Sequence, residues 1–265
     1  MQTLEEKKYL FENMPIPRAY MKLSIPVILS SLVTMLYNLA DTFFVGMLND
    51  PVQNAAVTLV FPVSLAFNAV NNLFGVGGSS MMSRSLGAGD EEKVRVTSAF
   101  SFYGALFSGL LFSLLVVSFK SPLLGILGAD RETYDATAGY LLWTVCFGAA
   151  PTILNVVQSY LVRSEGAALH ASIGTMSGCF LNILLDPVFI LPWGLNMGAA
   201  GAGLATFVSN MAACGYFIIL ALAKGKRTYV CMDLRKLRCL TKDVVTGVTT
   251  TSFVRHLSFR RSIQT

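Results

Sequence analysis

The stretch LSIPVILSSLVTMLYNLADTFFVGML, residues 23–48, decides the class of this protein. It is longer than the ~20 apolar residues that a helix needs to cross a bilayer, and Asp41 is its one charged residue. The run is too long for the core of a signal peptide and lacks a small-residue cleavage site, so we expect an uncleaved first span. A carboxyl group inside a span costs roughly 2.5–3.5 kcal/mol on insertion scales, which makes Asp41 a candidate functional residue.

The whole chain has the composition of a membrane protein. It is 54% hydrophobic and 13% charged, whereas soluble domains carry about 25% charged residues. Strand-type alternation is absent, which argues against a barrel. The second and fourth apolar runs are longer than a bilayer requires, so we expect them to tilt, bend or extend beyond it. We predict an all-α integral membrane protein, a bundle of six transmembrane helices at about residues 23–48, 55–83, 96–119, 136–162, 171–192 and 199–223.

The basic residues indicate the orientation of these spans. With the N-terminus inside, all but two of the 20 Lys and Arg residues fall on the cytoplasmic side, and only Lys120 and Arg131 fall outside. We therefore expect residues 1–22 to be a cytoplasmic N-terminal segment. Residues 224–265 form a basic cytoplasmic tail whose sequence is atypical after about residue 240. The net charge of +5 reflects this topology on a lipid bilayer, and we expect no nucleic-acid partner.

A second carboxyl group lies inside a predicted span and shares the depth of the first. Asp186 is the only charged residue between Glu165 and Lys224. Asp41 is seven residues from Leu48 (48 − 41) and Asp186 is seven from Trp193 (193 − 186), which places both carboxyl groups roughly 10 Å below the outer edge. Thr206 is seven residues into the sixth span, which runs in the opposite direction, and so reaches the same depth.

Each aspartate also has a polar neighbour one helical turn earlier. Tyr37 precedes Asp41 by four residues and Asn182 precedes Asp186 by four, so each pair shares a helix face. These oxygens could surround a small hard cation, or the two carboxyl groups could hold a proton, because burial and a neighbouring carboxylate both favour the neutral form. The alternative is that each aspartate only accepts a hydrogen bond from a neighbouring helix, which leaves their matched depth unexplained.

A second set of polar residues lies deeper in the predicted spans. Amide side chains there can hold helices together at about 0.6 kcal/mol each, or line a polar cavity for a substrate, and the sequence favours neither. Gly174 and Gly178 form a GxxxG pair that favours close helix packing. Prolines within or near the spans are candidate bends, namely Pro26, Pro62, Pro151 and Pro187. The deeper polar residues are Thr34, Asn68, Asn71, Asn72, Asn155 and Gln158.

Four motifs together resemble one known family. They are the first span from Ile25-Pro26 through LYNLADT (residues 36–42) to Val45-Gly46, GVGGSS at 75–80 with RSLGAGD at 84–90, NILLDP at 182–187, and GAAGAGLAT at 198–206. In combination, over about residues 15–240, they resemble the multidrug and toxic compound extrusion (MATE) transporters. The aspartate at position 41 resembles the pattern of one prokaryotic branch of that family, which is named after DNA-damage-inducible protein F.

The resemblance implies a secondary antiporter in a prokaryotic cell membrane. It would expel cationic or amphipathic drugs or metabolites in exchange for Na⁺ or H⁺, with no cofactor besides this coupling ion. The resemblance implies a bend of the first helix at Pro26 and a possible Na⁺ site at Asp41, Asn182 and Asp186. The residues that match the cation-coupling site are Tyr37, Asp41, Asn182 and Asp186, with Thr206 as the nearest hydroxyl.

The family has twelve helices in two six-helix lobes, whereas this chain has six predicted spans. We therefore expect it to represent the N-terminal lobe, truncated or frame-shifted after about residue 240. Its partner would be the missing C-terminal lobe or a second copy of this chain. A non-transporting membrane fragment or a self-pairing half-transporter is the main alternative.

Two further alternatives have less support in the sequence. A lipid-linked precursor flippase would need cationic residues in its cavity to hold phosphate, and the middle of these spans contains none. An intramembrane protease would rest on the two aspartates alone. The five cysteines form no CxxC pair, no HExxH motif is present, and neither histidine lies in a span. We therefore expect neither a disulfide framework nor enzyme activity.

Overall fold

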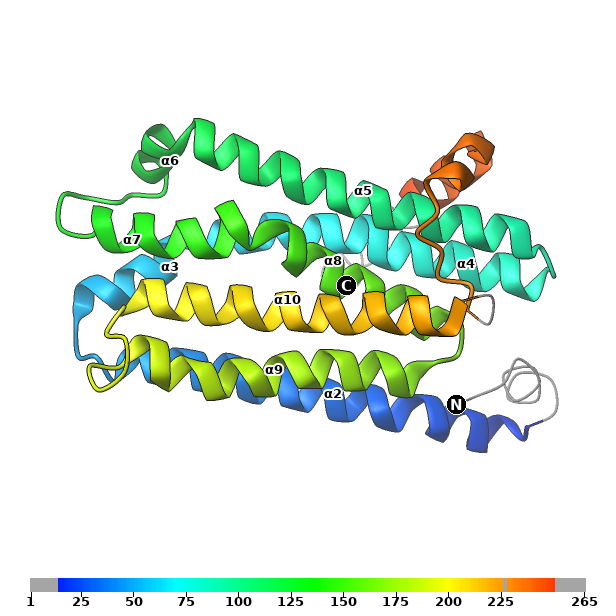
Figure 1. Cartoon of the computed structure of the whole chain (residues 1–265), viewed down its shortest axis with the longest axis horizontal. Helices are drawn as coiled ribbons and strands as arrows, with labels where there is room; N and C mark the ends of the chain where they lie inside the picture. Colours follow the sequence, from blue (N-terminus) through cyan, green and yellow to red (C-terminus); the bar gives the residue numbers. More distant parts are fainter. Residues whose placement is uncertain (1–13, 226–227, 251–265) are drawn as a thin grey trace, which may run out of the picture.

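A computed structural model describes residues 14–225 and 228–250, and this part of the chain consists of helices and the turns between them (Figure 1). Residues 1–13 of the predicted N-terminal segment and residues 251–265 of the predicted tail lie outside it. The elements are α2 (Ile16–Gly46), α3 (Pro51–Val70), η1 (Asn71–Val76), α4 (Gly77–Gly87), α5 (Glu91–Ser118), α6 (Lys120–Ile126), α7 (Tyr134–Leu141), η2 (Leu142–Phe147), α8 (Ala149–Ser164), α9 (Ala168–Ile190), α10 (Ala199–Lys224) and η4 (Leu234–Cys239).

Five described helices are long and apolar enough to cross a membrane, and a bent pair of helices forms a sixth candidate span. The prediction of a six-helix membrane bundle is confirmed. The second span extends over Pro51–Gly87, because α3, η1 and α4 continue one another. The first helix begins at Ile16, before the apolar run that predicted it, and so includes residues assigned above to the N-terminal segment.

The fourth span bends by 50° between η2 and α8. The bend lies at Gly148 and not at Pro151, which occupies the first turn of α8, where a missing N–H costs little. The six residues of η2 form a π-helix, whose wider turn brings backbone oxygens close to Gly148. A Cβ atom at Gly148 would lie 2.5 Å from the carbonyl oxygen of Thr144, so the tight backbone here requires glycine.

Aspartates at the ends of two spans cap the helices that follow them. Asp50 Oδ1 accepts a hydrogen bond of 2.9 Å from the backbone N–H of Val52 at the start of α3. Asp90 Oδ1 accepts one of 3.0 Å from Lys93 at the start of α5. Both carboxylates satisfy backbone donors that would otherwise lack a partner, which accounts for acids at these turns.

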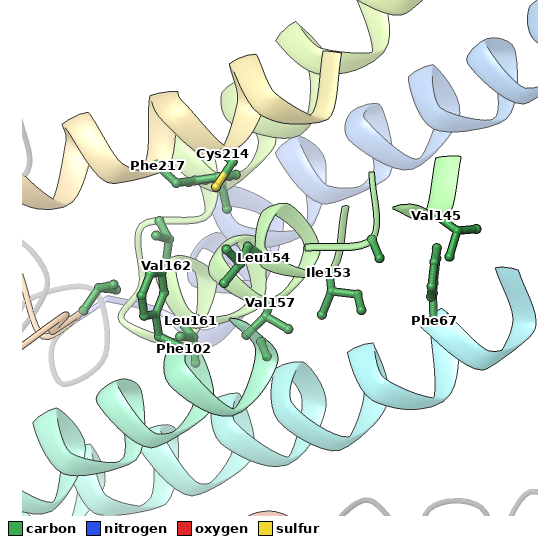
Figure 2. Packing of buried hydrophobic residues seen from close by; sticks show 14 of the residues in the cluster. Phe67, Phe102, Val145, Ile153, Leu154, Val157, Leu161, Val162, Cys214 and Phe217 are labelled. Carbon is green, nitrogen blue, oxygen red and sulfur yellow. The ribbon is translucent and has the colours of Figure 1, made fainter. Parts of the chain in front are cut away.

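The core lies around α8, which packs against α5, α9 and α10. Figure 2 shows Leu154 and Val157 of α8 between Phe102 of α5 and Phe217 of α10, with Ile153 farther along, towards Phe67. In contrast, α2 lies at the edge of the lobe along α9 (Figure 1). Only two of its residues are buried, Ser30 and Val45. The lobe therefore has a rigid centre and one helix that is held mainly by a single neighbour.

Close contact between α9 and α10 depends on glycine, as the GxxxG pair predicted. A Cβ atom at Gly178 would lie 3.1 Å from the Cβ of Ala213, and one at Gly174 would lie 2.5 Å from the ring of Phe217. The two helix backbones can approach each other because these methyl groups are absent. This approach brings the polar residues farther along α9 next to those of α10.

Candidate functional site

Asp186 and Asn182 occupy the face of α9 that meets α10, and both are almost completely buried. In the orientation of the Asn182 amide that satisfies both of its ends, Nδ2 donates to Asp186 Oδ2 at 3.0 Å. In that orientation Oδ1 accepts from the backbone N–H of Thr206 at 3.1 Å. The amide also lies 3.4 Å from the Thr206 hydroxyl. Asn182 therefore connects the Asp186 carboxyl group to α10.

Tyr37 and Asp41 approach the same position from α2. The Tyr37 hydroxyl forms a hydrogen bond with Thr206 and interacts electrostatically with both Asp41 and Asp186. The Oδ1 atom of Asp41 is buried and has no hydrogen-bond partner among the described residues. A buried acceptor without a donor is costly in a membrane, where water cannot replace the missing bond. The arrangement thus leaves one carboxylate oxygen free to bind a ligand.

The structure brings together the five residues predicted from span depth and helix-face spacing. They come from three helices: Tyr37 and Asp41 from α2, Asn182 and Asp186 from α9, and Thr206 from α10. The set supplies two carboxyl groups, an amide, a phenol and a hydroxyl. Such oxygen donors suit a small hard cation, and the paired carboxyl groups equally suit a proton.

Tyr140 of α7 was not predicted from the sequence, and it lies within electrostatic range of this site. It is half-buried and interacts electrostatically with Asp41, Tyr37 and Asp186. Tyr140 lies six residues after Tyr134, where the structure begins this helix, whereas the sequence predicted the span to begin at about residue 136. This spacing (140 − 134) places it roughly 9 Å below the outer edge, close to the depth of the two aspartates.

Two of the deeper polar residues connect α8 to α10. Asn155 Nδ2 donates to Asn210 Oδ1 at 2.9 Å, and Asn210 Nδ2 donates to the backbone oxygen of Thr206 at 2.8 Å. One turn further along, the Cys214 thiol donates to Gln158 Oε1 at 3.4 Å. These contacts extend the polar network from the aspartates into the lobe. Asn210 was not among the residues predicted from the sequence.

The other deeper polar residues are dispersed. Thr34 donates to the backbone oxygen of Ser30 at 2.8 Å, within its own helix. Asn68 is exposed on α3, and Asn72 is half-buried in η1. Asn71 is buried, and its Oδ1 has no partner among the described residues. A single substrate cavity formed by all six residues stays a prediction.

The predicted hinge residue lies inside an unbroken helix. Pro26 is half-buried, and α2 continues through it from Ile16 to Gly46. A proline at this position removes one backbone hydrogen bond and so lowers the cost of bending. Its role as a hinge stays a prediction.

Comparison with known proteins identifies relatives with the same lobe. The MatE family model matches residues 26–188. The multidrug export protein MepA of Staphylococcus aureus is 36% identical over 233 residues, which cover 88% of this chain and 51% of MepA. MepA of Staphylococcus saprophyticus is 34% identical over 245 residues, covering 92% of this chain and 53% of that protein. This chain therefore spans about half the length of these curated relatives.

Solved structures agree with the sequence matches. An outward-facing multidrug resistance MATE family transporter of the MOP superfamily superposes with a TM-score of 0.82 at 30% identity, covering 99% of this chain and 57% of that one. A MATE crystal structure in the bent conformation superposes with a TM-score of 0.80. The six-helix bundle thus corresponds to one lobe of the MATE fold. With the family model matching more than half of its residues, this chain belongs to the MatE family of multidrug and toxic compound extrusion transporters.

Proposed function

We propose that this lobe carries the coupling site of a cation-driven antiporter that exports cationic or amphipathic compounds. The observation that carries the proposal is that Asp186, which is hydrogen-bonded to Asn182 on α9, interacts electrostatically with Asp41 on α2, whose buried Oδ1 has no hydrogen-bond partner among the described residues. Two carboxyl groups close together in a low-dielectric interior repel each other when both are ionised. One Na⁺ or one H⁺ relieves that repulsion.

The position of Asp41 on α2 suggests how occupancy would affect conformation. Asp186 lies on α9, which is fixed by close packing to α10, whereas α2 contacts mainly α9. A cation shared by the two carboxyl groups draws α2 towards α9, and its loss lets the carboxyl groups move apart. A ligand shifts such an equilibrium only by its differential affinity for the two states, and this attraction supplies the difference. Pro26 offers the point at which α2 would bend.

The export substrate is proposed from the charge of the site and from the relatives. An organic cation would compete with the coupling ion for the same negative charge. The Staphylococcus relatives are multidrug export proteins, which supports the same substrate class for a protein that contains this lobe.

Transport by a chimeric protein tests the proposal. This chain, replacing the matching half of S. aureus MepA, is expressed in an efflux-deficient cell, and ethidium efflux is followed under imposed Na⁺ or H⁺ gradients. We expect gradient-dependent efflux that Asp41→Asn or Asp186→Asn abolishes and that the exposed Asp135→Asn preserves. Efflux that stays gradient-dependent in both buried variants would contradict the assigned coupling site.

A further inference from the structure

The segment that follows α10, residues 228–239 (the strap), is fixed to α5. The Tyr103 hydroxyl donates to the backbone oxygen of Met232 at 2.6 Å. The backbone N–H of Cys231 donates to Ser98 Oγ at 3.0 Å. Figure 1 shows this segment leaving the end of α10 and crossing α5. The strap therefore lies beside the charged end of the bundle, where α5 begins and α10 ends.

The 3₁₀-helix η4 at the end of the strap carries its basic residues on two different faces. Residues three apart eclipse each other in a 3₁₀-helix, so Arg235 and Arg238 lie on one face and Lys236 on another. Lys236 Nζ contacts both carboxylate oxygens of Glu92 on α5, at 2.7 and 2.8 Å. The lysine thus holds η4 against α5 and turns the arginine face away from it.

The two arginines are exposed, and neither forms an ion pair with any residue in 14–225 or 228–250. The acid nearest in sequence, Asp233, uses Oδ1 to accept the backbone N–H of Arg235 at 2.9 Å and so caps η4. Two guanidinium groups on one face, each with five N–H donors, form a site for a doubly hydrogen-bonding anion such as a phosphate ester.

An apolar group completes this site. Arg235, Arg238 and Leu234 line a recess of about 480 Å³ on the surface. Leu234 is 61% exposed. The helices α5 and α10, whose ends adjoin the strap, are long and apolar enough to cross a membrane. At the end of a membrane span, basic side chains can contact lipid headgroups while a neighbouring apolar side chain contacts the acyl chains.

We propose that Arg235, Arg238 and Leu234 bind one anionic phospholipid, with its phosphate on the two guanidinium groups and its glycerol and upper acyl chain against the leucine. A soluble phosphate would satisfy the arginines but would leave Leu234 in water. A zwitterionic lipid carries a cation that the two arginines repel. Bound lipid would hold the strap, and with it the chain that leaves α10, at the membrane surface.

Native mass spectrometry of the full chain tests this site. The chain is titrated in detergent with dioleoylphosphatidylglycerol or dioleoylphosphatidylcholine, and bound lipids are counted. We expect phosphatidylglycerol to bind Arg235→Gln/Arg238→Gln about 30-fold more weakly than wild type, which is ~2 kcal/mol at ~1.4 kcal/mol per factor of ten. The matched control, Arg18→Gln/Lys22→Gln, removes two exposed charges from α2 and should change binding less than about threefold.

Other outcomes overturn the proposal. An equal loss in the control would mean that total charge, and not this recess, attracts the lipid. Equal binding of the two lipids by the wild-type chain would exclude selection of an anion. Leu234→Gln should weaken the binding of phosphatidylglycerol several-fold, and unchanged binding would contradict a role for the leucine. Displacement of the lipid by millimolar inorganic phosphate would identify a soluble-anion site instead.

Discussion

Adding one methyl group at Gly174 should separate α9 from α10. A Cβ atom there would lie 2.5 Å from Phe217 Cζ and 2.8 Å from Tyr216 Cδ1. Phe217 is 1% exposed and belongs to the buried cluster of Figure 2, so its ring is surrounded by other side chains. Overpacking of this kind costs about 1–3 kcal/mol. Because alanine also favours a helix over glycine by about 1 kcal/mol, the clash must be measured against a control that shares this gain.

Gly215→Ala is that control, because a Cβ atom at Gly215 meets nothing within 4 Å on the same helix pair. Gly178→Ala should be intermediate, since its Cβ would lie 3.1 Å from the Cβ of Ala213, which can yield slightly. We expect Gly174→Ala to be less stable than Gly215→Ala by about 1–3 kcal/mol, with Gly178→Ala between them.

Thermal unfolding in detergent, followed with a thiol-reactive fluorophore, measures this order. The thiols of Cys179 on α9 and Cys214 on α10 are buried and react when the two helices separate. If Gly174→Ala unfolds at the same temperature as Gly215→Ala or above it, then Phe217 does not restrict this interface. The close α9–α10 approach that positions Asn182 against Thr206 would then need another explanation.

Three further predictions address other parts of the lobe. Asn155→Ala and Asn210→Ala should show a coupling of about 0.6–1.7 kcal/mol in a double-mutant unfolding cycle, and strict additivity would contradict their hydrogen bond. Tyr140→Phe should weaken cation binding, measured by titration, while changing the unfolding midpoint little, because only the hydroxyl that interacts electrostatically with the two aspartates is lost. Backbone and side-chain donors of Thr133 lower the pKa of the Asp130 carboxyl group in the exposed loop. The stabilisation from these bonds is therefore present above the unfolded-state pKa and is lost as the pH falls through the lower folded-state pKa. A carbon-13 titration should show the Asp130 midpoint rising in Thr133→Ala, and an unchanged midpoint would contradict this cause.

The sequence was sufficient to place polar residues at a common depth where that depth follows from counting along one helix. Asp41, Asp186 and Thr206 could be placed at one level by counting residues, and Tyr37 and Asn182 follow from helix-face spacing. Tyr140 reaches a similar depth only when it is counted from Tyr134, where the structure begins its helix, and not from the predicted start at about residue 136. It was missed because a tyrosine inside a span carries no energetic anomaly that draws attention to it, unlike a carboxyl group.

Features that depend on contacts between helices could not be predicted in this way. The fourth span bends at Gly148, where the π-helix η2 changes the register of its residues, and the sequence offered Pro151 as the more obvious break. That register decides which polar side chains face the lobe interior. Asn68 is exposed and Asn155 is buried, although both are asparagines within apolar spans. Only the packing of α8 against α10 distinguishes them.

The central claim is that Asp41 and Asp186 act as one cation site, and cation-dependent stability of the purified chain tests it most directly. The unfolding temperature is measured as Na⁺ replaces choline at fixed pH, and as the pH is varied without Na⁺. A single bound cation at 100 times its dissociation constant stabilises the folded state by about 2.7 kcal/mol. We predict that wild type and Asp135→Asn respond to one of the two cations, and that Asp41→Asn, Asp186→Asn and the double variant lose that response equally. A response that survives in either single variant, or that falls additively in the double variant, would contradict a shared site.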